Sequence, residues 1–354
     1  MEKKLTNKNF CFISSKNEKI KSESISIKQS GKDYMYYGND NLYPQGLFNL
    51  YKECSNLQGI IDSIVTYIMG DGLKINHSTV INKKNETLSD IIEKIIFDYV
   101  VYGGYVINII KSVTGEIVEI YHQDFKRVRI NEEETMCYIN KDWFKNSNKF
   151  IKIPIYEKDS DEPSSIFYYK GKRTIDTYPI PMWNSAIKGA SNLVEVDNYH
   201  LSSLHNDFGP SVMLSFTEGK PDIEAQEEIE TSINDKWSGS TNAGKLLLTF
   251  SDTPETAPKL TPIGQEDWGD RYQSLITSSK ESLYSSFRIS SVLVGGSSQS
   301  TGFNAIEFKS AFVLYNKTVI SPIQKQLETT FKTILPELGI EFIEFDTSGF
   351  DNNN

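Results

Sequence analysis

The sequence predicts an α+β fold, in which short strands and long helices occupy different parts of the chain. Between residues 105 and 182, short apolar segments alternate with polar turns, as paired strands do. Residues 57–68 and 91–100 instead repeat isoleucine, leucine and valine every three or four positions, as the buried face of a helix does. Residues 267–335 form a long helical pattern that is interrupted by one glycine- and serine-rich stretch.

The N-terminal part of the chain begins with a polar segment. Residues 1–37 are rich in lysine, serine and asparagine and show little periodicity, so we expect a flexible N-terminal arm that gains a strand only beside a partner. A helix is expected near residues 44–53. A second, strongly apolar helix follows, with Ser55 or Asn56 as its cap and Gly70 at its end.

A third helix and a set of strands complete the first half. The helical pattern restarts near Ser89, and Gly103 and Gly104 end it. Residues 105–110 and 117–121 then read as two strands around a turn, which predicts a β-hairpin. Further short strands, separated by polar turns, are expected after the hairpin.

The second half of the chain alternates long helices with short strands. In chain order we expect a helix, a strand, an acidic helix, a second strand and a longer helix, at residues 191–207, 212–216, 222–237, 244–250 and 267–289. The two long helices therefore flank an insertion that contains strands.

The last two helical stretches are joined by a loop of unusual composition. Residues 294–303 are mostly glycine, serine, threonine and glutamine, so this loop should be exposed and mobile. Asn304 with Glu307 three positions later is a helix-start pattern. In the helix that follows, Pro322 removes a backbone donor, so we expect a kink or a restart there, and a last strand at residues 340–345.

The overall composition argues against some functions. The 354-residue chain has a formal net charge of −10, which argues against a protein that reads nucleic-acid sequence but is compatible with one that encloses DNA. Its 3 cysteines are scattered and odd in number, which favours a reducing compartment over a disulfide framework. No apolar stretch of about 18 residues occurs, so we expect no membrane-spanning helix.

Residues that could carry chemistry do not gather in the sequence. The 4 histidines, His77, His122, His200 and His205, lack the spacing of metal ligands, so we expect structural or solvated roles for them. The glycine- and serine-rich loop has no lysine at the phosphate-binding position and follows a helix, unlike a P-loop. We therefore predict no catalytic residue, no metal site and no cofactor, and we do not expect an enzyme.

Several short motifs occur in a characteristic order. They are YGNDNLYP at 37–44, DYVVYGGY at 98–105, SGSTNAGK at 238–245 and FRISSVLVG at 287–295, with Glu307 and Pro322 in the last long helix. In this order they resemble the motifs of tailed-bacteriophage portal proteins, of the compact lambdoid or prophage type. Two serines replace the prolines of that family's F-x-V-P-P-x-L-L-G motif. The likeness extends over about residues 37–346.

The resemblance implies a portal-like protomer with an α/β wing, paired long stem helices, a small α/β clip and a kinked long helix after a tunnel loop. The implied parts are a flexible arm at 1–37, an N-terminal wing at 38–185, a first stem helix at 186–209, a clip at 210–264, a second stem helix at 265–290, a tunnel loop at 291–303, a kinked helix with a C-terminal wing strand at 304–346 and a polar tail at 347–354.

The resemblance also implies a function. Portal proteins form a homo-oligomeric ring, usually a dodecamer, at one vertex of the virion capsid, after assembly in the host cytoplasm and without a membrane. Double-stranded DNA would pass through the channel, without sequence specificity, during packaging, retention and ejection. The implied partners are the large terminase, the major capsid protein or scaffold, and head-completion or adaptor proteins.

Site residues follow from the same resemblance. The tunnel loop would present small uncharged residues to DNA, namely Gly295, Gly296, Ser297, Ser298, Gln299, Ser300, Thr301 and Gly302. The clip would dock other proteins through a region that includes Trp237, Asn242, Gly244 and Lys245, and Pro322 would be the helix kink. Since no ATP site is expected, translocation would need a separate motor.

Two other functions stay open on the sequence. A head–tail adaptor also forms a ring in the virion, although adaptors are usually shorter and lack paired stem helices around an insertion. A soluble α+β enzyme could use residues 294–303 as an active-site lid, but it would need catalytic groups near that loop.

Overall fold

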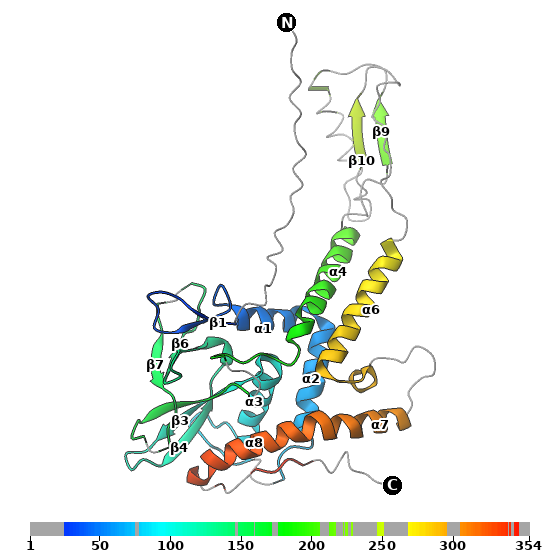
Figure 1. The fold of residues 1–354 in the computed structure, drawn as a ribbon. Helices are drawn as coiled ribbons and strands as arrows, with labels where there is room; N and C mark the ends of the chain where they lie inside the picture. Colours follow the sequence, from blue (N-terminus) through cyan, green and yellow to red (C-terminus); the bar gives the residue numbers. More distant parts are fainter. Residues whose placement is uncertain are drawn as a thin grey trace.

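The computed structural model describes residues 25–74, 78–145, 148–158, 160–171, 176–205, 212–216, 222, 224–225, 228, 246–250, 268–295, 305–338, 340 and 343–346. These residues combine helices with small sheets, so the α+β class predicted from the sequence is confirmed. Figure 1 shows a body from which two long helices, α4 (Ile187–His205) and α6 (Trp268–Phe287), project side by side. Within the described residues, no helix combines the length and the apolar character needed to cross a membrane.

The N-terminal segment joins the body earlier than we expected. Strands β1 (Ser26–Lys28) and β2 (Met35–Tyr37) pair antiparallel, and the side chains of Tyr34 and Tyr37 are buried. The structure therefore differs from the expected flexible arm of residues 1–37, because aromatic side chains near its end pack into the core. The residues before Ile25 lie outside the described part.

Three helices form the centre of the body, α1 (Tyr43–Glu53), α2 (Ser55–Met69) and α3 (Leu88–Tyr102). Isoleucines recur along α2 and α3 at the spacing of one helix face, and each of them is buried: Ile60, Ile61, Ile64, Ile68, Ile91, Ile92, Ile95 and Ile96. Burying one such side chain contributes about 1.5–3 kcal/mol, so the contact between α2 and α3 is a major part of the core.

The helix starts differ from those we expected. Neither Ser55 nor Asn56 caps α2: the residue at the cap position is Cys54, and no side chain accepts a hydrogen bond there. In α3, Thr87 and Asp90 form a capping box, in which each side chain accepts a hydrogen bond from the other residue's backbone N–H. We did not predict this cap, because we placed the start of the helix from the isoleucine spacing alone.

Two small sheets complete the body. Strand β3 (Tyr105–Lys111) lies between β4 (Ile117–His122) and β8 (Ser164–Tyr169) and is antiparallel to both, so the predicted hairpin is confirmed. The second sheet has the order β5–β6–β7, with strands at Val128–Ile130, Met136–Ile139 and Ile151–Pro154. Both sheets are antiparallel, as short connections require.

The turn between α3 and β3 has no room for a side chain. Gly103 has a left-handed φ of 84°. A Cβ added at Gly104 would lie 2.4 Å from the carbonyl oxygen of Tyr169. Only glycine lets the end of α3 come this close to the end of β8.

The projecting helices lead to two further strands. In Figure 1, β9 (Val212–Phe216) and β10 (Leu246–Phe250) lie beyond α4 and α6, and they pair in parallel. Both were expected near these positions. Helix α4 begins earlier than expected, because a 3₁₀ turn (Asn184–Ala186) leads directly into it. The acidic helix expected at 222–237 lies largely outside the described residues.

The C-terminal part runs along the base of the body in Figure 1. It consists of α7 (Ala305–Tyr315), a π-helical turn (Asn316–Ile320), α8 (Ser321–Ile334) and a 3₁₀ turn (Leu335–Leu338). Among the described residues, the strand predicted near the C-terminus is reduced to one antiparallel bridge between Phe345 and Leu73. Backbone hydrogen bonds on both sides of this bridge join Lys74 N to Glu344 O at 2.9 Å and Asp346 N to Gly72 O at 2.8 Å.

Gly104→Ala should lower the free energy of unfolding by roughly 1–3 kcal/mol, because the new methyl group meets the Tyr169 carbonyl oxygen. Thermal unfolding followed by circular dichroism measures the effect. The matched control is Gly46→Ala in α1, where an added Cβ meets no atom within 4 Å. Alanine is the better helix former there, so the control should melt at the same or a higher temperature. Equal melting temperatures for the two variants would show that residue 104 has room.

Candidate functional site

The two projecting helices approach each other closely near the body. A Cβ added at Gly189 of α4 would lie 3.1 Å from the carbonyl oxygen of Ser279 on α6, and Ser279 is buried. Farther out, the rings of Tyr199 and Tyr272 stack with their centroids 5.3 Å apart. Small residues at one end and aromatic rings at the other thus hold the pair together along its length.

The end of α6 is fixed in the core before the predicted tunnel loop begins. Phe287 is buried, and its ring stacks on that of Trp183 with a centroid distance of 6.2 Å. Arg288 then takes a left-handed φ of 54°, a conformation that glycine usually supplies at helix ends. A 3₁₀ turn (Ser291–Val294) and Gly295 follow. Residues 288–295 are termed the loop root below.

One side chain of α2 contacts the chain on both sides of this loop. The Tyr67 hydroxyl donates a hydrogen bond to the Leu293 carbonyl oxygen at 2.5 Å, and its ring packs edge-on against Phe312 with centroids 5.5 Å apart. Leu293 precedes the loop, and Phe312 lies on α7, which follows it. Burial raises the pKa of Tyr67, so the phenol keeps the proton that it donates. Tyr67 therefore ties the start of the loop, and the helix that follows the loop, to α2.

Pro322 lies at the second position of α8, directly after the π-helical turn. Proline has no N–H for the carbonyl oxygen four residues before it, and its ring crowds that oxygen. The wider turn of Asn316–Ile320 takes up this mismatch, while Val319 and Ile320 stay buried. The helical path thus continues through the expected kink position with a changed hydrogen-bonding pattern.

Most of the predicted site residues lie outside the described part of the chain. Of the eight predicted DNA-facing residues of the tunnel loop, the structure describes Gly295 but not Gly296, Ser297, Ser298, Gln299, Ser300, Thr301 and Gly302. The predicted clip residues are also outside it, namely Trp237, Asn242, Gly244 and Lys245. Their roles stay predictions.

His122 has a structural environment. Its Nε2 lies 2.7 Å from Asp98 Oδ2, and Asp98 is buried. Burial raises the pKa of Asp98. The pair joins α3 to β4, which agrees with the structural role expected for this histidine. Within the described ranges, no group of three or more histidine, cysteine, aspartate or glutamate side chains is arranged to hold a metal ion.

Two residues of this site were not predicted from the sequence. Tyr67 lies in α2 among core isoleucines, and its contact with Leu293 spans 226 positions. Arg288 lies within the helix predicted at 267–289, whereas the observed helix ends at Phe287, and the sequence carries no mark of its left-handed conformation. Only the tertiary structure brings these residues to the loop, and no local pattern could have identified them.

The sequence and the fold were compared with known proteins. The sequence matches the profile of the phage portal protein family over residues 78–354, and no curated protein matches it. A chain of the virion of a native gene transfer agent particle is 12% identical, with 87% of this chain and 85% of that chain covered and a TM-score of 0.56.

Two further solved structures are similar. A chain of the neck of the native gene transfer agent particle, computed with C12 symmetry, is 13% identical, with 86% of this chain and 85% of that chain covered and a TM-score of 0.54. An HK97-family phage portal protein from Corynebacterium diphtheriae is 9% identical, with 87% and 97% covered and a TM-score of 0.49. At these identities, similarity to a solved structure concerns the fold alone.

Tyr67→Phe keeps the ring beside Phe312 but removes the hydroxyl that binds Leu293. We expect a loss of about 1 kcal/mol in the free energy of unfolding. Backbone amides of the loop root should also exchange hydrogen faster, which mass spectrometry of peptides from residues 288–295 measures.

The control for this experiment is Tyr51→Phe. It removes a hydroxyl that donates to Asp62 Oδ1 at 2.9 Å, between α1 and α2, and it leaves the loop contacts in place. The exchange rate of the loop root should therefore stay at the wild-type value. Wild-type exchange in Tyr67→Phe as well would show that this hydrogen bond does not hold the root.

Proposed function

Because this chain belongs to the phage portal protein family, we propose that it forms a ring at one capsid vertex and that double-stranded DNA passes through the ring. The family match covers both projecting helices, the loop root, α7 and α8. It favours a portal over the two other functions that the sequence left open, a head–tail adaptor and a soluble enzyme with a lid.

The anchored loop root is the observation that carries this proposal. A stretch of small uncharged residues joins α6 to α7 in the sequence, and Tyr67 ties the residue before it, Leu293, and the helix after it to α2. An anchored root lets the loop touch a moving DNA backbone without displacing the body. Serine, glutamine and glycine make weak, uncharged contacts with phosphates, which suit sliding and do not read sequence.

Exposed apolar side chains support a ring of many copies. On α7, Ile306 and Leu314 are 79% and 66% exposed, and on α4 Leu201 is 55% exposed. In a ring, neighbouring copies would cover such side chains, in an obligate interface of roughly 2,000–5,000 Å². We propose a dodecamer, for which the similar neck structure with C12 symmetry is the support.

We assign the docking of other proteins to the tip of the projection. Trp237, Asn242, Gly244 and Lys245 fall between β9 and β10 in the sequence. The large terminase would dock there during packaging, and head-completion or adaptor proteins afterwards. The wing would meet the major capsid protein or scaffold during assembly in the host cytoplasm. The ring itself would act as a passive conduit and valve, with a separate motor driving translocation.

The purified protein should form rings with a central hole in negative-stain electron microscopy. Its mass in solution should be near twelve times the 40.3 kDa of one chain. A closed dimer with a deep pocket would contradict the portal assignment and favour the enzyme.

Replacing Gln299 and Ser300 together by glutamate should leave the rings intact and reduce the DNA content of assembled particles. Each added carboxylate repels a phosphate by about 1 kcal/mol at 4 Å in water. The control replaces Val113 and Thr114, in the exposed turn between β3 and β4, by glutamate, and it should package DNA normally. Intact rings whose particles hold the wild-type amount of DNA would rule out the tunnel-loop assignment.

A further inference from the structure

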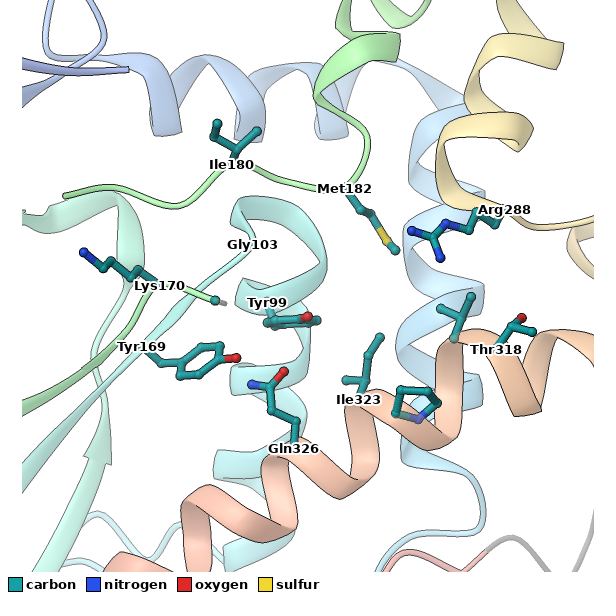
Figure 2. A pocket seen from close by; sticks show the side chains of 13 residues that line it. Tyr99, Gly103, Tyr169, Lys170, Ile180, Met182, Arg288, Thr318, Ile323 and Gln326 are labelled. Carbon is teal, nitrogen blue, oxygen red and sulfur yellow. The ribbon is translucent and has the colours of Figure 1, made fainter. Parts of the chain in front are cut away.

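A cavity of about 260 Å³ lies between the body and the loop root (Figure 2). Tyr99 at the end of α3 and Tyr169 at the end of β8 line one side. Gln326 of α8 lies beside Tyr169, whereas Arg288 of the loop root lies away from the two tyrosines, next to Met182. The cavity has room for a side chain but not for a folded domain.

The inner end of the cavity offers hydrogen-bond donors. Tyr169 Oη and Gln326 Nε2 are buried, and neither makes a hydrogen bond of ordinary geometry within the described part of the protein, although the two side chains are close enough for a weak one with each other. Figure 2 shows the hydroxyl of Tyr169 pointing toward Gln326. Burial raises the pKa of Tyr169 to about 12, so the hydroxyl stays protonated. Buried donors without an acceptor cost free energy, and an acceptor brought in from outside would recover it.

The mouth of the cavity carries a cation without a counter-ion. The Arg288 guanidinium points from the end of α6 toward Met182 (Figure 2). It makes no ion pair with any other described residue. The second cation at the cavity, Lys170, is already paired with Glu134. Arginine is also an unfavourable residue for the left-handed φ of 54° at this position, where glycine would be free of strain.

We propose that this cavity receives an acidic side chain of a neighbouring copy of this chain, whose carboxylate pairs with Arg288. The inference rests on the ring proposed above. The hydrogen-bond donors that line the cavity favour an occupant that brings acceptors. A guanidinium such as that of Arg288 binds a carboxylate through two parallel hydrogen bonds. Backbone or side-chain carbonyl oxygens of the same segment would accept from Tyr169 and Gln326.

A second copy is the source that the chain itself favours. The chain carries 47 aspartates and glutamates against 37 lysines and arginines, so acidic side chains outnumber basic ones. In the proposed ring, neighbouring copies would present these side chains to one another at a high effective concentration.

An occupied cavity would link neighbouring copies to the loop. Arg288 opens the loop root, and Thr318 and Val319 of the cavity wall belong to the π-helical turn. One inserted side chain of the adjacent copy would therefore contact both the loop root and the π-helical turn before α8. The loops around the ring would then move together.

Arg288→Gly is the first test. Glycine relieves the left-handed backbone, so an isolated copy should be at least as stable as the wild type. Assembly should weaken, with the ring dissociating at a concentration about tenfold higher or more, because a charge-assisted hydrogen bond is lost at each interface. Arg288→Lys keeps the charge but not the paired geometry, so it should fall between the two.

The matched control is Lys317→Ala, which removes an exposed cation beside the cavity wall without touching the cavity. Its rings should dissociate at the wild-type concentration. Analytical ultracentrifugation measures all four proteins. If Arg288→Gly rings dissociate at the wild-type concentration as well, the cavity assignment is overturned.

Cross-linking at Met182 identifies the occupant directly. Copies grown with photo-methionine, which is close to methionine in size, are mixed with ¹⁵N-labelled copies, assembled and irradiated. We expect peptides with Met182 to be linked to ¹⁵N peptides that contain aspartate or glutamate. Links confined to one copy would overturn the proposal.

Two further outcomes separate the alternatives. If the wild-type protein never assembles, the proposed ring itself is overturned. If the wild type forms rings and the Arg288→Gly rings are equally stable, only the cavity assignment is overturned. Millimolar glutarate, a free dicarboxylate, is added to isolated copies in a thermal-shift assay. A rise in melting temperature that Arg288→Gly abolishes would identify a small carboxylate as the occupant and overturn the second copy as its source.

Discussion

The position of helix α2 is the constraint on which the loop and the base of the protein depend. One side of α2 packs its isoleucines against α3, and Tyr67 contacts Leu293 and Phe312. At its end, the Ile68 carbonyl oxygen accepts a hydrogen bond from Gln324 Nε2 of α8 at 2.8 Å. Because interiors are close-packed, α2 cannot shift toward one of these partners without losing another. The same helix therefore fixes the core, the start of the loop and the helices that follow the loop.

Elements with short-range contacts could be predicted from the sequence, whereas long-range pairing could not. The β3–β4 hairpin follows from alternation around Gly115, and α2 and α3 follow from isoleucine spacing. The parallel pairing of β9 and β10 joins strands far apart in the chain, so no local pattern encodes it. The N-terminal segment is polar in composition, so its burial could not be predicted either. The side chains of Tyr34 and Tyr37 are nevertheless buried, which attaches the end of this segment to the body.

The candidate site divides in the same way. The loop could be located because glycine and serine replace apolar residues between two helical patterns. Its anchor could not be located, because Tyr67 reads as one more member of the α2 pattern. The proline of the last helix was visible in the sequence, but the π-helical turn that accommodates it depends on burial of Val319 and Ile320. Composition therefore indicated where a loop interrupts the helices, whereas the contacts of its root are visible only in the packing.

The close contact between α4 and α6 near the body limits how the projecting pair of helices can move. A helix of 20 residues, the length of α6, is about 30 Å long. Gly189 and Ser279 leave no room for a side chain between the helices, so a tilt of the pair would pivot near Ser279, about 17 Å from the start of α6 at Trp268. A rotation of about 5° there would displace this outer end by about 1.4 Å. A force on the outer end would therefore act, through the rest of α6, on Phe287, whose ring is buried beside Trp183.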